Sequence, residues 1–116
     1  MKHLFAFVAC FIFLSFLKAA GAHPPSDINI TFDPETKMLQ AEIMHNTSNP
    51  LTHYIKKIDL GLNGKEIIEH LVSKQDNNKS QKVSYLIVDV KDGDLITVEG
   101  YCSISGKLTK EIRVKM

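Results

Sequence analysis

Beyond the first 22 residues, four histidines and one cysteine are the side chains best suited to bind a metal ion. His45 and His53 stand at the two ends of the polar segment 46–52, so their imidazoles can reach one ion if the flanking strands are neighbours. Cys102 lies where a strand is expected to meet a turn, a place from which a thiolate can be directed toward the same ion. Two imidazoles and one thiolate suit iron, copper or zinc. The alternative is that these are isolated surface histidines and a buried, inert thiol.

His23 offers a different metal chemistry. If a signal peptidase cleaves after Ala22, the α-amino group of His23 is freed and can chelate one ion together with its own imidazole. This arrangement predicts a copper or zinc carrier. His70 lies close to Glu66 and Glu69 in the chain, and we predict that its side chain is solvated.

Signatures of the common enzyme classes are missing. The sequence has no Gly-x-Ser-x-Gly elbow, no glycine-rich phosphate loop, no His-Glu-x-x-His helix and no Cys-x-x-Cys pair. Its carboxylates are scattered along predicted strands and turns and suggest no acid/base couple. The histidines and the cysteine therefore remain the candidate site residues.

The first 22 residues have the three-part layout of a secretory signal. Lys2 and His3 precede an apolar run over residues 4–17, and the small residues Ala20, Gly21 and Ala22 follow it. The run is shorter than the roughly 20 residues that a membrane-spanning helix needs. We predict a signal peptide over 1–22, export to the periplasm or the extracellular space, and no stable membrane span after cleavage. An uncleaved anchor is the alternative.

Charge argues against a nucleic-acid partner. Removal of Lys2 and Lys18 leaves 12 basic against 13 acidic residues, a net charge near −1. Charges of both signs are interspersed along residues 27–115, with no basic face and no polybasic membrane patch. Only Cys102 remains after cleavage, so no disulfide can form within the chain.

Residues 23–116 suit one domain built from short strands. Turn residues separate seven segments of β character, at 27–32, 38–44, 54–62, 66–72, 83–90, 95–101 and 108–116. Leu39, Ala41 and Ile43 alternate with polar residues and predict a buried face. The segment 66–72 also fits a helical turn, and the polar segment 73–80 is predicted to be an exposed loop. The pattern predicts an all-β, immunoglobulin-like antiparallel sandwich of about seven strands.

Several of these motifs together resemble a known family. The motifs are His45, His53-Tyr54-Ile55-Lys56-Lys57-Ile58, Asn63-Gly64-Lys65, Gly93-Asp94 and Cys102-Ser103-Ile104-Ser105-Gly106. They resemble the iron domain of desulfoferrodoxin and neelaredoxin, the superoxide reductases, over roughly residues 38–106. That family has an immunoglobulin-like sandwich and one mononuclear non-haem iron, held by four histidines in a plane and one axial cysteine. The sixth position is open to superoxide.

Carried over residue by residue, the resemblance implies iron ligands at His23, His45, His53 and Cys102. The spacing between His45 and His53 is two residues longer than usual, and Ser105 stands where the fourth histidine is expected. The family's superoxide-attracting lysine has no counterpart. The implied reaction is one-electron reduction of superoxide to hydrogen peroxide, with a small-molecule oxidant or an electron-donor protein as partner. The alternatives are a metal-free immunoglobulin-like binding or assembly module and the copper or zinc carrier based on His23.

Overall fold

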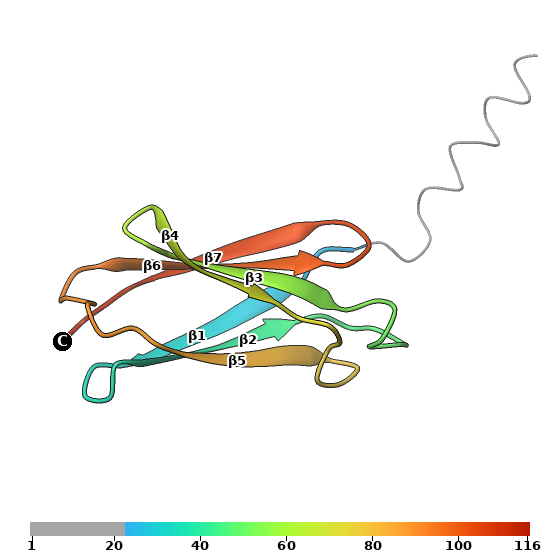
Figure 1. Ribbon diagram of the computed structural model, residues 1–116, viewed down its shortest axis with the longest axis horizontal. Helices are drawn as coiled ribbons and strands as arrows, with labels where there is room; N and C mark the ends of the chain where they lie inside the picture. The colour runs from blue at the N-terminus through green and yellow to red at the C-terminus, as the bar shows by residue number, and fades with distance from the viewer. Residues whose placement is uncertain (1–22) are drawn as a thin grey trace, which may run out of the picture.

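The protein is a two-layer β-sandwich (Figure 1). The computed structural model describes residues 23–116, so the predicted signal peptide lies outside the described residues. The strands are β1 (Asp27–Asp33), β2 (Met38–Met44), β3 (Ile55–Leu62), β4 (Lys65–Leu71), β5 (Ser80–Leu86), β6 (Leu95–Cys102) and β7 (Lys107–Arg113). No helix in residues 23–116 is long and apolar enough to span a membrane.

The strand order explains how distant segments meet. One sheet has the order β1-β2-β5 and the other β4-β3-β6-β7, and every pairing is antiparallel. β4 lies beside β3, so a helical turn at 66–72 does not occur: Ile68 of β4 pairs with Leu60 of β3. The predicted all-β, immunoglobulin-like sandwich of seven strands is confirmed.

The core fills the space between the sheets by simple alternation. Leu39, Ala41 and Ile43 of β2 are all buried, as their spacing predicts, because successive side chains of a strand point to opposite faces. Ile96 and Val98 of β6 meet them from the other sheet, and both are fully buried. The same period of two determines which side chains at the strand ends point toward the core.

The predicted boundaries are wrong in the polar region before β5. β5 begins at Ser80 and ends at Leu86, whereas apolar content predicts a strand over 83–90. Ser80 and Gln81 pair with Met44 and Ile43 of β2 and are buried despite their polarity. Gln75, within the loop predicted to be exposed, is only 1% exposed. Hydrogen bonding to the backbone and to other polar side chains allows these residues to be buried.

Candidate metal centre

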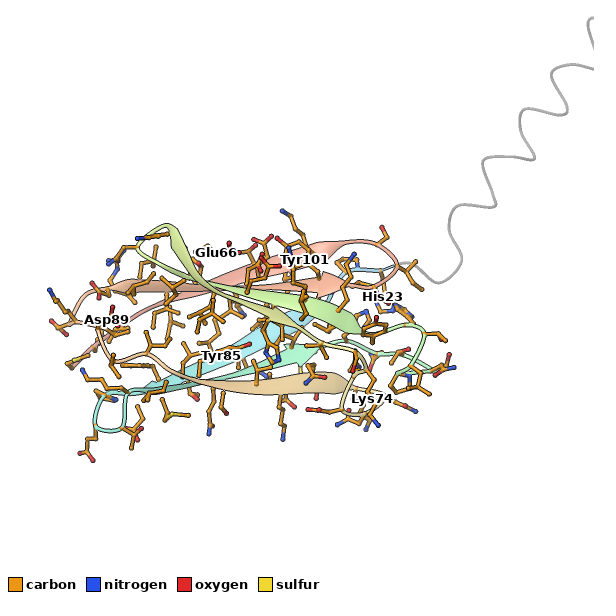
Figure 2. The ribbon with its side chains drawn as sticks, viewed as in Figure 1. His23, Glu66, Lys74, Tyr85, Asp89 and Tyr101 are labelled. Atoms are coloured by element: carbon orange, nitrogen blue, oxygen red, sulfur yellow. The ribbon has the colours of Figure 1, made fainter. Side chains whose placement is uncertain are left out.

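Three histidines from separate parts of the chain meet at one end of the sandwich. His23, His45 and His53 each offer a ring nitrogen, and these atoms all lie within 4.8 Å of one another. The ring centroids are 4.7 to 4.8 Å apart. Figure 2 shows His23 at the end of the sandwich where Lys74 also lies, opposite Asp89. We call these three residues the histidine cluster; they are one of two groups of side chains in residues 23–116 that could hold a metal ion.

His45 reaches the cluster as an extension of β2. It continues the inward-facing row of Leu39, Ala41 and Ile43, because it follows Ile43 by two residues. Its backbone N–H donates to the carbonyl of Lys79 at 2.8 Å, so strand-like pairing persists past the end of β2. The side chain is only 1% exposed. The ring position is therefore set by rigid structure.

His53 is placed by the turn that leads into β3. The carbonyl of Asn49 accepts hydrogen bonds from the N–H groups of Thr52 and His53, at 3.2 and 2.9 Å. Next in the chain, Tyr54 is tied to Ser103 by two bonds: its N–H donates to the Ser103 hydroxyl, and its carbonyl accepts from the Ser103 N–H. His53 is half-buried and precedes the buried Ile55 by two residues. These bonds anchor the segment on both sides of the ring.

His23 depends on two prolines that pack against glycines of the other sheet. A Cβ added to Gly106 would lie 3.0 Å from the N, Cα and Cβ of Pro24. A Cβ added to Gly100 would lie 3.7 Å from Cγ of Pro25, which is buried. The absence of a side chain at Gly106 therefore lets Pro24 lie against the turn before β7. Pro25 is at ordinary van der Waals distance from Gly100 of β6, where an added Cβ would lie closest to Ile43, at 3.0 Å. His23 itself is exposed, so it is the adaptable member of the cluster.

Two of the three rings present a buried nitrogen that has no hydrogen-bond partner within residues 23–116. These atoms are Nε2 of His45 and Nε2 of His53. Buried polar atoms are normally paired, and leaving one unpaired costs about 1–3 kcal/mol. These two nitrogens lie beside a third imidazole, that of His23, so all three rings could share one ligand.

The environment favours the neutral imidazoles that metal binding needs. Burial is the largest cause that lowers the pKa of His45, and the hydrogen bond with Gln75 partly opposes it. Burial also lowers the pKa of His53, with further contributions from the charges of His45 and His23. A ligating imidazole must be unprotonated, so a lowered pKa reduces proton competition for the site.

Cys102, predicted as a further ligand, is not a member of the histidine cluster. Its side chain is 2% exposed, on the inward face of β6, and its sulfur accepts a weak hydrogen bond from the N–H of Ile104 at 3.5 Å. It forms no disulfide within residues 23–116. Its backbone pairs with Ile55, two residues after His53, so the thiol lies at the same end of the sandwich as the cluster.

His70 and Gln75 also differ from their predicted surroundings. His70 is half-buried, and a hydrogen bond of 2.8 Å joins its Nδ1 to the hydroxyl of Tyr85, so it links β4 to β5 and is not simply solvated. Gln75 contacts His45 directly, at 2.9 Å from Nδ1. No motif marks Gln75 in the sequence, and the polar residues around it gave no sign of burial.

A second group of possible ligands lies on the outer face of the β3–β4 pair. Oxygens of Asp59, Glu66 and Glu69 lie within 4.8 Å of one another, and the two glutamates are exposed. The negative charge of Asp59 raises the pKa of Glu66. Lys57 forms a salt bridge with Asp59 at 3.4 Å, so the chain itself supplies a cation here. The histidine cluster is the better metal site because its buried nitrogens have no partner.

No family model matches this chain, and no curated protein matches it either. The functional argument therefore starts from the cluster itself.

Proposed function

We propose that this protein is an exported metal-binding protein that holds one divalent transition-metal ion through His23, His45 and His53. The observation that carries the proposal is the pair of buried, unpartnered Nε2 atoms of His45 and His53 beside a third imidazole. Imidazole suits iron, copper and zinc, so the ligand type selects this group of metals against calcium or magnesium. The resemblance to superoxide reductases favours iron.

The spacing of the rings fits an ion of this class. Nitrogens bound about 2.1 Å from one ion lie roughly 3–4 Å from each other. The three ring nitrogens start within 4.8 Å, and the exposed His23 can approach the two anchored rings without disturbing the core. Three protein ligands leave coordination positions open to water or a small molecule.

Elemental analysis of protein purified without oxygen tests the proposal. The expected result is one transition-metal ion per chain in the wild-type protein, or one equivalent taken up when ferrous, zinc or cupric ion is added. His45→Ala should lose stoichiometric binding because it removes an anchored ligand.

His70→Ala is the matched control. Like His45→Ala, it removes a hydrogen-bonded imidazole, but His70 is half-buried and lies outside the cluster. It should bind one ion as the wild-type protein does. Equal binding by His45→Ala and wild-type protein would contradict the proposal.

Superoxide reduction is the second candidate function. Its support is the resemblance together with the place of Cys102. In the pairing of β3 with β6, Cys102 lies opposite Ile55, which follows His53 by two residues. A ferrous ion in the site would supply the one electron that, with two protons, converts superoxide to hydrogen peroxide. The present ligand set falls short of the family's, because Ser105 replaces one histidine and the Cys102 thiol is outside the cluster.

Thiolate–iron absorption separates the two functions. If Cys102 becomes a ligand, anaerobic addition of ferrous ion followed by one-electron oxidation should produce a visible thiolate-to-iron charge-transfer band. Cys102→Ser should remove that band and the superoxide reductase activity. Binding of iron with no such band would rule out the reductase and leave the metal-binding function.

A further inference from the structure

Gln75 is a buried polar side chain in an otherwise exposed loop. The loop connects β4 to β5, and Lys74 and Asp76, the neighbours of Gln75, are exposed. The Gln75 backbone N–H donates to the carbonyl of Pro50 at 3.1 Å, which ties this loop to the one that ends at His53. The side chain therefore enters the sandwich end from a loop that carries none of the three histidines.

The hydrogen bonds of Gln75 determine which way its amide faces. Nε2 donates to the carbonyl oxygens of His45 and Asn77, at 2.7 and 2.9 Å. Oε1 accepts from the N–H of Ile55 at 3.2 Å. A reversed amide would place an NH2 group against that N–H and an oxygen against two carbonyl oxygens. Every one of these contacts excludes the reversed orientation.

The orientation of the amide determines the tautomer of His45. Oε1 of Gln75 lies 2.9 Å from Nδ1 of His45, and an amide oxygen can only accept. In the neutral ring Nδ1 must therefore carry the proton, which leaves Nε2 with a free lone pair. That Nε2 is the buried atom that has no partner within residues 23–116.

We propose that Gln75 is a positioning residue of the histidine cluster: by accepting a hydrogen bond from Nδ1–H of His45 it keeps the Nε2 lone pair free for a metal ion. This inference rests on the proposed metal-binding function. Hydrogen bonds to the far nitrogen of a metal-binding histidine orient the ring and raise its basicity, and their removal costs about tenfold to a hundredfold in metal affinity.

The tautomer can be measured without any metal. A long-range proton–nitrogen correlation spectrum of the histidine rings in the metal-free protein should show His45 in the Nδ1–H form. Gln75→Leu should shift His45 to a mixture of tautomers or to the Nε2–H form, and should weaken zinc binding by about tenfold to a hundredfold. Gln75→Met serves the same purpose with an unbranched side chain if the leucine variant does not fold.

Gln81→Leu is the matched control. Gln81 is another buried glutamine close by in the chain, and its side chain bonds with Asp76 and Lys82 and not with a histidine. It should keep the Nδ1–H form of His45 and the wild-type zinc affinity.

The Nε2–H form in wild-type protein, or an unchanged tautomer in both Gln75 variants, would overturn the proposal. The Nδ1–H form in a wild-type protein that binds no metal would overturn the proposed function instead, and the control of the tautomer by Gln75 would stand.

Discussion

Replacement of Gly106 by alanine tests whether the packing of Pro24 holds His23 in the cluster. Gly106 has a φ of +90°, a conformation that side-chain-bearing residues rarely adopt. Strain of this kind costs about 1–3 kcal/mol, and each 1 kcal/mol lowers the melting temperature of a domain of this size by roughly 4–8 °C. The new Cβ would also lie 3.0 Å from three atoms of Pro24. Pro24 must then move by a few tenths of an ångström and carry His23 with it.

Gly93→Ala separates the strain from the displacement. Gly93 has a φ of +84°, and an added Cβ there meets no atom within 4 Å. Both variants should therefore lose stability through backbone strain in thermal unfolding of the metal-free protein, and Gly106→Ala should lose somewhat more because Pro24 must also move. Only Gly106→Ala should lose metal affinity, by up to about tenfold, because a shift of a few tenths of an ångström at His23 is a smaller change than loss of a ligand's hydrogen-bond partner, which costs about tenfold to a hundredfold.

The assay is competition for zinc against a chromophoric chelator, carried out well below the melting temperature of both variants. If the two alanine variants bind zinc with equal affinity, the segment 23–25 does not position His23, and the role given to the glycine–proline contacts is wrong.

Two further predictions concern protonation and the chain terminus. The pKa values of His45 and His53 lie below 6.5 in the folded chain, so the unfolded chain binds more protons below that pH. The free energy of unfolding of metal-free protein should be fully retained above about pH 6.5 and should fall as the pH drops through the folded values, and urea titrations over this range would detect it. Replacing both histidines with asparagine should make the free energy of unfolding depend less on pH over this range. A wild-type stability that does not change with pH would show that the pKa values of the two histidines are not lowered by folding. If cleavage exposes the α-amino group of His23, one alanine added before it should weaken cupric binding and leave zinc binding by the three imidazoles unchanged; equal cupric affinities, measured by calorimetry, would exclude the amino group as a ligand.

The strands and their inward faces could be predicted from local pattern. Alternation in β2 correctly identified Leu39, Ala41 and Ile43 as core residues, and the same period extended by two residues points His45 inward. The prediction placed the start of β5 too late in the chain. Ser80 and Gln81 are buried because their polar groups are hydrogen-bonded, and a hydropathy pattern does not detect such burial. The burial of Gln75 could not be predicted for the same reason.

The sequence by itself determined the residue types of the site, the all-β class and the inward face of β2. Those properties follow from side-chain chemistry and from the period of two along a strand. Only the tertiary structure decided that His23, His45 and His53 meet, that Gln75 joins them, and that the Cys102 thiol stands outside their group. The reason is that convergence depends on how two sheets stack and on where loops cross their ends, and such long-range contacts have no local pattern in the chain.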